Sequence, residues 1–274
     1  MTGTLTLVAT PIGNMGDLAP RAIEAFEAAH LVCCEDTRRT GSLLKQIGVR
    51  VDELRRLDEH TEFEAIPGLL QRLQAGERVV LVSDAGTPGI SDPGERLVAA
   101  AVDAGIEVTT VPGPVAAIAA LVSSGLPAGR FVFEGFLARK GQERSAQLAS
   151  IAGEARTTVF YESPNRVAAT LAALAEVCGD DRRAVVAREL TKLHEELRRG
   201  TLAELADWAA EGVKGEVVVV VEGAAASAEL DDDALAARVA ALVAEGSSKR
   251  DAVDRVVAET GARRGRVYDL SLTI

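Results

Sequence analysis

The sequence predicts an α/β fold: two α/β domains followed by a small helical module at the C-terminus. Short apolar runs rich in Val and Leu alternate with segments of helical periodicity through residue 225. Such alternation predicts helix-covered sheets, with parallel βαβ units in the first half of the chain. After the three aspartates at 231–233 the strand patterns stop and only helical spacing continues.

Short apolar runs mark the expected strands. The last of them contains five consecutive valines after Lys214-Gly-Glu216, which predicts a central, buried strand. In chain order the expected strands are Leu5–Ala9, Leu31–Cys34, Val79–Ser83, Val108–Val111, Phe131–Phe133, Thr158–Tyr161, Ala184–Ala187 and Glu216–Glu222.

Helical spacing with start and stop residues marks the expected helices. Pro20 suits a first helical position, whereas Gly76 and Gly105 suit positions just past a helix end. Ser163 is expected to cap a helix whose first residue is Pro164. The expected helices between the strands include Pro20–Ala29, Ile66–Ala75, Pro93–Ala104, 114–123 and Ser145–Ile151.

In the C-terminal module, Leu235, Val239 and Leu242 recur at helical spacing, and Ser248 begins a second helix with a capping box. Pro/Gly-rich and polar segments at 124–129 and 224–233 mark the boundaries. They predict domains at 1–124 and 125–227 and a helical module at 228–274.

Composition bounds the class of protein. The chain has 274 residues, 47% of them hydrophobic but only 3% aromatic, which predicts an aliphatic core. It has no apolar run of membrane-spanning length and no basic-then-apolar signal segment at its start. Its three cysteines, two of them adjacent at Cys33 and Cys34, fit neither a disulfide framework nor a zinc site. We therefore expect a soluble, cytoplasmic protein.

The net charge of −11 argues against nonspecific nucleic-acid binding, which requires cations to displace counterions from phosphates. A local basic surface on an acidic body remains compatible with it.

Three strands of the first half end in Pro/Gly loops: Thr10-Pro-Ile-Gly-Asn14, Ser83–Gly94 and Pro112-Gly-Pro114. Loops at the carboxyl edge of a parallel sheet are where α/β proteins bind ligands. The chain lacks both G-x-G-x-x-G and G-x-x-x-x-G-K-[ST], and Asp84 and Asp92 would repel a polyphosphate. The loops suit a ligand with hydroxyls, an amine or a cationic centre; the alternative is a set of ordinary tight turns.

Charged residues follow other strands, at Glu35-Asp-Thr-Arg-Arg39 and Arg188-Glu-Leu-Thr-Lys192, although solvated turns explain such runs equally well. The sequence has no G-x-S-x-G nucleophile elbow and no metal-ligand spacing, so no metal site is predicted. The C-terminal helices are locally basic and resemble a helix-turn-helix, with a helical cap that packs a dimer as the alternative.

Taken together, the motifs closely resemble the ribosomal RNA small subunit methyltransferase I family of the tetrapyrrole methylase-like superfamily, over essentially the full length. The combination of Thr-Pro-Ile-Gly-Asn with Ser-Asp-Ala-Gly-Thr-Pro is specific to that branch. The motifs are Leu7-Val-Ala-Thr-Pro-Ile-Gly-Asn14, Glu35-Asp-Thr-Arg38, Leu81-Val-Ser-Asp-Ala-Gly-Thr-Pro88, Asp92-Pro-Gly94, Val111-Pro-Gly-Pro114, Glu134-Gly-Phe136, Phe160-Tyr-Glu-Ser163, Ala187-Arg-Glu-Leu-Thr-Lys192 and Lys214-Gly-Glu216.

The resemblance implies a cleft for S-adenosyl-L-methionine between the two α/β domains, a homodimer, and 2′-O-methylation of a cytidine ribose in the decoding region of 16S rRNA within the small ribosomal subunit. Tetrapyrrole-methylating members have a Gly-rich first loop and a Gly-Asp-Pro motif, where this chain has Pro11-Ile-Gly-Asn14 and Ser83-Asp-Ala85. That departure disfavours a porphyrinoid substrate. The alternatives are a methyltransferase for a small, tetrapyrrole-like acceptor, and a noncatalytic ribosome-binding relative, against which the intact loops argue.

Site residues follow from matching positions. Expected cofactor contacts, with Asp84 the leading side chain, are Thr10, Pro11, Asp84, Ala85, Gly86, Thr87, Gly113, Pro114, Val115, Ala116, Tyr161, Ala187, Gly215 and Glu216. Unranked candidates for a catalytic base are Glu35, Asp36, Glu189 and Lys192, and candidates for RNA phosphate contacts are Arg38, Arg39, Arg139, Lys140 and Arg188.

Overall fold

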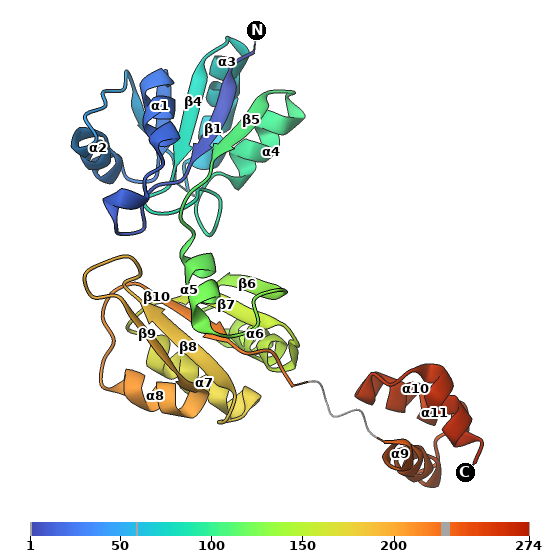
Figure 1. Ribbon diagram of the computed structural model, residues 1–274. Helices are drawn as coiled ribbons and strands as arrows, with labels where there is room; N and C mark the ends of the chain where they lie inside the picture. The colour runs from blue at the N-terminus through green and yellow to red at the C-terminus, as the bar shows by residue number, and fades with distance from the viewer. Residues whose placement is uncertain (1, 59, 226–230, 274) are drawn as a thin grey trace. The chain divides into compact units, whose positions relative to one another are not determined.

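The computed structural model describes residues 2–58, 60–225 and 231–273 (Figure 1). Its contacts divide the chain into two compact units, Met1–Ala152 with Arg156–Glu222, and Gly153–Ala155 with Gly223–Ile274. The first unit holds two five-stranded sheets. The second holds the C-terminal helices.

The first sheet is entirely parallel, with strand order β3-β2-β4-β1-β5. Its strands are β1 (Thr4–Val8), β2 (Leu31–Cys34), β3 (Leu54–Arg56), β4 (Arg78–Val82) and β5 (Glu107–Val111). The helices between them are η1 (Met15–Asp17), α1 (Pro20–Ala28), α2 (Thr37–Gln46), α3 (Glu62–Gln74) and α4 (Glu95–Asp103).

Helices cover both faces of this sheet. Along β4, Val79 and Leu81 pack in a cluster with residues of α3 and α4. Val80 and Val82 point the other way, into a cluster with residues of α1 and α2. Burial on both faces explains why β2 and most of β4 are continuous apolar runs, as the sequence predicted, whereas the edge strand β5 is mostly exposed.

The carboxyl ends of β4, β1 and β5 are adjacent because these strands are parallel neighbours. Thr10 and Gly86 exchange backbone hydrogen bonds of 2.8 and 3.0 Å between their loops. The Thr87 hydroxyl donates to the carbonyl of Pro114 over 3.2 Å. The prediction that three Pro/Gly loops share one sheet edge is confirmed.

The second sheet is mixed, with order β6-β7-β10-β8-β9 and only β6 and β7 parallel. Its strands are β6 (Phe131–Phe136), β7 (Thr157–Glu162), β8 (Arg183–Arg188), β9 (Glu196–Thr201) and β10 (Val217–Val221). Its helices are α5 (Ala116–Ser124), α6 (Gly141–Gly153), α7 (Val167–Cys178) and α8 (Leu202–Ala210).

The five-valine strand β10 is central, as predicted. Val219 and Val221 pack with residues of α6, α7 and α8, whereas Val218 and Val220 pack with residues of α5. Although α5 precedes the predicted boundary at 124/125, it lies against this second sheet. That boundary stays a prediction, and the one at 227/228 falls outside the described residues.

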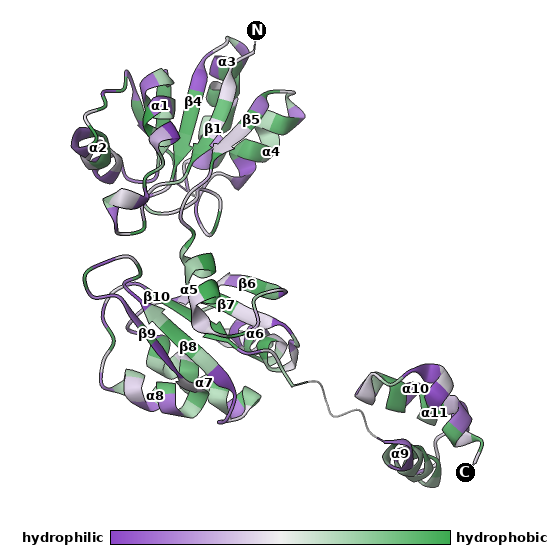
Figure 2. Cartoon of the chain, in the orientation of Figure 1, coloured by the Kyte–Doolittle hydropathy of each residue, from purple (hydrophilic) through white to green (hydrophobic). Residues whose placement is uncertain are grey.

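Strands such as β4 and β8 are largely hydrophobic, whereas β9 is hydrophilic (Figure 2). Two edge strands, β3 and β9, were not predicted because charged residues interrupt their apolar pattern. Helices α2 and α8 were also missed. The Ser163 prediction is wrong for the helix proper: α7 begins at Val167, and the Ser163 hydroxyl instead accepts from the amide of Asn165 in the preceding turn.

The C-terminal unit consists of α9 (Asp232–Ala244), α10 (Lys249–Thr260) and α11 (Arg264–Ser271) around its own apolar cluster. Asp231 and Ser248 cap the first two helices, and Gly261 ends the second at φ 67°. Arg264 pairs with Asp254 at 2.8 Å, so part of the local positive charge is neutralised within the unit.

No helix among the described residues is both long and apolar enough to cross a membrane. Cys33 and Cys34 lie buried in β2 as free thiols, and burial raises the pKa of Cys33 to about 12.

Candidate functional site

A cavity of about 370 Å³ lies against loops from both sheets, within the size range of small-molecule sites. Its walls combine aliphatic and aromatic side chains with exposed backbone of two glycine loops and a few carboxylates. It is lined by Ile12, Ala85, Gly86, Thr87, Ile90, Ser91, Asp92, Val115, Ala116, Phe136, Tyr161, Glu162, Ser163, Pro164, Gly215, Glu216, Val217 and Val218.

The loop after β4, residues 83–94, forms one wall and is held in an unusual backbone conformation. Gly86 and Gly94 have φ values of 81° and 129°, and Ser91 adopts φ 61° although it carries a side chain. A Cβ at Gly94 would lie 2.5 Å from a methyl of Leu81, so only glycine fits there. Strained residues of this kind concentrate at binding sites, where surrounding contacts hold them in place.

The first loop, residues 10–14, contacts the loop after β8. Ile12 is buried in the same cluster as β10 residues of the second sheet. The Asn14 amide donates to the Thr191 hydroxyl over 3.1 Å, and a Cβ at Gly13 would lie 2.5 Å from the Lys192 side chain. Gly13 therefore permits the close approach of the two loops.

Glu189, Lys192 and Glu216 form a charged cluster beside the cavity. The Lys192 ammonium donates to Glu189 over 2.8 Å and to Glu216 over 2.9 Å. Glu189 also accepts from the Glu216 amide over 2.9 Å. The Lys192 hydrogen bond lowers the pKa of Glu189, whereas the pKa of Lys192 is raised by both glutamates although burial opposes it.

Gly215, with φ 90°, lies directly against the Glu189 side chain, and any Cβ there would collide with that carboxylate. The sequence placed Gly215 among the expected cofactor contacts. In the structure its lack of a side chain makes room for Glu189.

A cluster of aromatic side chains forms another side of the cavity. Tyr161 packs against Phe133 and Phe136, with ring centroids 5.1 and 5.5 Å apart. Phe136 is 57% exposed, so most of its ring remains available to a ligand. Burial raises the pKa of the Tyr161 phenol, which favours its neutral, hydrogen-donating form.

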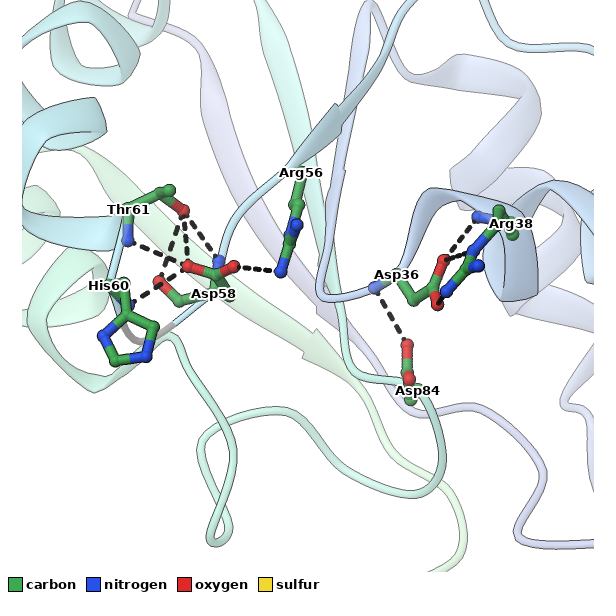
Figure 3. A network of polar contacts seen from close by, with 7 residues as sticks. All are labelled: Asp36, Arg38, Arg56, Asp58, His60, Thr61 and Asp84. Carbon is green, nitrogen blue, oxygen red and sulfur yellow. Dashed lines mark hydrogen bonds and ion pairs between the residues drawn. The ribbon is translucent and has the colours of Figure 1, made fainter.

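Asp84 points away from the cavity, toward the turn after β2. Its carboxylate accepts a hydrogen bond from the Asp36 amide over 3.0 Å (Figure 3). It also pairs with Arg39 at 3.5 Å. Asp36 caps α2 and receives Arg38 Nε over 3.0 Å, and these Arg38 hydrogen bonds hold the pKa of Asp36 well below its usual range.

Asp58, at the end of the neighbouring strand, anchors the start of α3 (Figure 3). It accepts hydrogen bonds of 2.9 Å from both the amide and the hydroxyl of Thr61, and Arg56 pairs with it at 2.6 Å. The Thr61 hydroxyl leads the contacts that lower the pKa of Asp58. This network fixes the loop geometry at the sheet edge.

For two other acids, Glu35 and Asp92, the pKa is raised rather than lowered. Burial, followed by the charge of Asp84, raises the pKa of Glu35. Burial, followed by the charge of Glu35, raises the pKa of Asp92 to about 6. Perturbed carboxyls beside a cavity are candidates for proton transfer.

The predicted cofactor residues divide into two layers. Those that line the cavity are Ala85, Gly86, Thr87, Val115, Ala116, Tyr161, Gly215 and Glu216. The others are absent from its walls: Thr10, Pro11, Asp84, Gly113, Pro114 and Ala187. Thr10 and Pro114 support the lining loops through hydrogen bonds, and Ala187 is fully buried beneath them.

The predicted RNA contacts differ in their surroundings. Arg38 is exposed but paired with Asp36, and Arg188 donates to Glu196 over 2.7 Å. Arg139 and Lys140 are exposed at the end of β6, without an ion pair to any described residue.

Sequence reasoning missed several lining residues. From the sequence, Asp92 was considered only as part of a motif and as an acid that would repel a polyphosphate. Its raised pKa comes first from burial and then from the charge of Glu35, both of which the fold supplies. Glu162 is buried and satisfied by the Ser163 amide and the Thr170 hydroxyl, over 2.8 and 2.7 Å. The others are Ile12, Ile90, Ser91, Phe136, Ser163, Pro164, Val217 and Val218.

Within the described ranges no group of three or more His, Cys, Asp or Glu side chains could hold a metal ion.

Both the sequence and the fold of this chain match those of known proteins. Residues 4–206 match the family "Tetrapyrrole (Corrin/Porphyrin) Methylases". A crystal structure of uroporphyrin-III C-methyltransferase from Thermus thermophilus, complexed with S-adenyl homocysteine, superposes with a TM-score of 0.56 at 18% identity, covering 80% of this chain and 97% of that one. At this identity the likeness concerns the fold.

Relatives in sequence are much closer. "Ribosomal RNA small subunit methyltransferase I" of Mycobacterium tuberculosis is 50% identical over 272 residues, covering 98% of this chain and 95% of the relative. The protein of that name from Synechocystis sp. is 45% identical, covering 99% and 98%. With such identity over nearly its whole length, the chain belongs to the ribosomal RNA small subunit methyltransferase I family, within the tetrapyrrole (corrin/porphyrin) methylases.

Proposed function

We propose that the chain is an S-adenosyl-L-methionine-dependent methyltransferase that modifies 16S rRNA, at the 2′-oxygen of a cytidine ribose in the decoding region. The observation that carries this proposal is the 50% identity, end to end, to a ribosomal RNA small subunit methyltransferase. The cavity beneath its family motifs supplies a place for the chemistry.

The residues of the cavity fit S-adenosyl-L-methionine. Backbone groups of Ala85, Thr87 and Gly215 offer donors and acceptors to its amino-acid end and adenine, whereas those of Gly86 and Glu216 are already bonded to Thr10 and Glu189. Ile12, Val115 and Val218 offer apolar contact. The acidic residues of the walls suit a ligand with a positive sulfur and an ammonium group. The cavity volume, about 370 Å³, suits a compact, folded ligand.

When bound, the group supplies a methyl carbon already activated by a sulfonium centre. The protein's contribution is therefore mainly positioning, which contributes about 7–11 kcal/mol when reactants are well oriented. Residues of the 83–94 loop line the cavity, Lys192 of the 189–192 loop is bonded to the lining residue Glu216, and aliphatic lining residues limit the access of water. A general base adds about 10²–10⁴-fold to the loss of the ribose proton.

Exposed cations beside the cavity would receive the RNA. Arg139 and Lys140 follow β6, whose last residue, Phe136, lines the cavity. They are charged groups without an internal partner among the described residues, so they are available to phosphates at low cost.

A homodimer in the cytoplasm is the setting that we propose for this reaction. Ile118 and Val122, one turn apart on α5, are 40% and 69% exposed. Such an apolar patch suits burial against a second copy of the chain.

A labelled-methyl assay tests the proposal. The purified protein is incubated with S-adenosyl-L-methionine carrying a radioactive methyl, using small subunits or naked 16S rRNA from cells that lack the enzyme. We expect the label in 16S rRNA. The RNA backbone at one decoding-region cytidine should then resist alkaline cleavage. Label in an added tetrapyrrole but none in RNA would contradict the proposal and favour a small-molecule methyltransferase. Failure to bind S-adenosyl-L-methionine in calorimetry would favour a noncatalytic relative.

A further inference from the structure

Three acidic side chains line the cavity, and two of them are already committed to partners. Glu162 is fully buried at its side chain and pairs with Arg166 at 3.3 Å, besides its two hydrogen bonds. Glu216 pairs with Lys192 at 2.9 Å. Each of these two carboxylates therefore already has a cation as its partner.

Asp92 is the third, and its surroundings differ. It makes no ion pair with any residue that the structure describes, and its one neutral hydrogen-bond partner is the Ser83 hydroxyl. The charged groups that face it from the first sheet are the acids Glu35 and Asp84. From the second sheet it faces Tyr161, whose phenol its charge affects.

The backbone around Asp92 is fixed rather than adaptable. Ser91 precedes it at φ 61°, and a Cβ at Gly135 of β6 would lie 3.1 Å from the Ser91 hydroxyl. Pro93 and Gly94 follow, with Gly94 pressed against Leu81. A half-buried acid is thus held at the cavity wall on a loop with little freedom to turn away.

We propose that Asp92 is the catalytic base that removes the proton from the acceptor hydroxyl. This inference rests on the proposed function, since it assumes methyl transfer to a hydroxyl oxygen in this cavity. The oxygen forms a new bond to the methyl carbon while the bond from sulfur to that carbon breaks, leaving its electron pair on sulfur. The hydroxyl proton passes to the Asp92 carboxylate and from there to solvent.

The acidity of the residue matches that role. Burial first, and then the nearby charge of Glu35, raises the pKa of Asp92 to about 6, close to the working pH at which a general base is most effective. The four candidates named from sequence fit less well. Asp36 is bound by Arg38, and Glu189 and Lys192 neutralise one another. Glu35 is absent from the cavity walls and acts on Asp92 as a positioning residue, through its charge.

The first test needs no cofactor. Carbon-13 NMR of aspartate-labelled protein should show one carboxyl with a titration midpoint near pH 6, absent from Asp92→Asn. In Glu35→Gln the same midpoint should shift to lower pH, because a like charge has been removed. An Asp92 carboxyl that titrates below pH 4.5 would overturn the proposal.

The second test measures transfer on RNA. Asp92→Asn should bind S-adenosyl-L-methionine within about threefold of wild type by calorimetry yet transfer methyl about 10²–10⁴-fold more slowly. The wild-type rate should fall about tenfold per pH unit below pH 6, and the Asn variant should lose that dependence. Asp92→Glu should restore part of the rate, and Asp103→Asn, at the exposed end of α4, is the matched control.

The outcomes separate the two proposals. If wild type methylates 16S rRNA and Asp92→Asn does so at a similar rate, the inference about Asp92 is wrong and the proposed function stands. If wild type leaves RNA unlabelled under all conditions, the proposed function fails first. Loss of cofactor binding in a folded Asp92→Asn protein would also overturn the role as a base, since it would assign the residue to binding.

Discussion

The loop after β4 and the loop after β8 differ in how their acidic residues are paired. In the loop after β8, Glu189 is paired with Lys192 and with a backbone amide, and its pKa is lowered. In the loop after β4, Asp92 faces other acids without a cation, and its pKa is raised. The comparison teaches that the first arrangement stabilises its carboxylate as an anion, whereas the second disfavours the charged form, as the proposed role of Asp92 requires.

Disrupting the paired loop should have the largest effect. Gly215→Ala places a Cβ on the Glu189 carboxylate at φ 90°, so the side chain must leave Lys192 and the Glu216 amide. We expect the free energy of unfolding to fall by about 2–4 kcal/mol, measured by urea titration. The matched control is Gly212→Ala, which has φ 105° but open space around its Cβ, and should lose about 1–2 kcal/mol. Equal losses would show that the Glu189 contact is unimportant.

Asp92→Asn should raise stability, which is the reverse of the usual effect of an active-site change. Because the folded pKa of about 6 exceeds the ordinary 3.8, folding becomes less favourable as pH rises between these values. Because Asn carries no charge, the Asp92→Asn variant does not lose this stability as pH rises. Allowing for partial solvent screening, we expect a gain of about 1–2 kcal/mol at pH 8 and none at pH 3.5, measured by urea titration at both pH values. A variant less stable than wild type at pH 8 would contradict this sign.

Glu189→Gln should lower the stability of the protein, and the loss should be larger at high pH than at low pH. The folded pKa of Glu189 is lowered, so its contribution is present above the ordinary value of 4.5 and is lost as pH falls. We expect a loss of about 1–2 kcal/mol at pH 8 that shrinks toward pH 3.5, with the Lys192 ammonium left without one partner. Thermal unfolding across this pH range measures it, and a loss independent of pH would point to packing rather than charge.

The smallest effect concerns cations with and without partners. Arg139→Ala should reduce the slope of log affinity for RNA against log salt by about one, because a phosphate contact is removed. Arg188→Ala should change that slope less, since Arg188 is held by Glu196 at 2.7 Å. Filter binding at several salt concentrations compares them, and equal slopes in the two variants would show that internal pairing does not decide RNA contact.

The sequence predicted the central strands well because their signal is local. Leu31–Cys34 was predicted with its observed bounds, and the valines of β10 left little choice. The edge strand β3, Leu-Arg-Arg, has no such pattern, because only one of its sides is paired and its charges reach solvent.

Loops as ligand walls could be predicted from Pro and Gly after strands, yet the roles of individual acids could not. Asp84 stood out in a motif, but its carboxylate turns toward Asp36 and Arg39. The pKa of Asp92 is raised first by burial and then by the charge of Glu35, 57 positions away in sequence, and the parallel order of the strands brings the two residues together. Burial and charge neighbours are properties of the fold, so they escape a reading of motifs.

The positions of the cysteines allow opening of the fold to be followed by thiol alkylation. Cys33 and Cys34 lie under the first sheet's helices, whereas Cys178 ends α7 beside the second sheet and is half-buried. With a pKa of about 12, the Cys33 thiol presents almost no thiolate to an alkylating reagent while the sheet is closed. Alkylation of that pair therefore records the opening of the first sheet, whereas the half-exposed Cys178 can react without any opening and serves as an internal reference. Mass spectrometry of a timed reaction would thus report how fast the first sheet opens, without any introduced label.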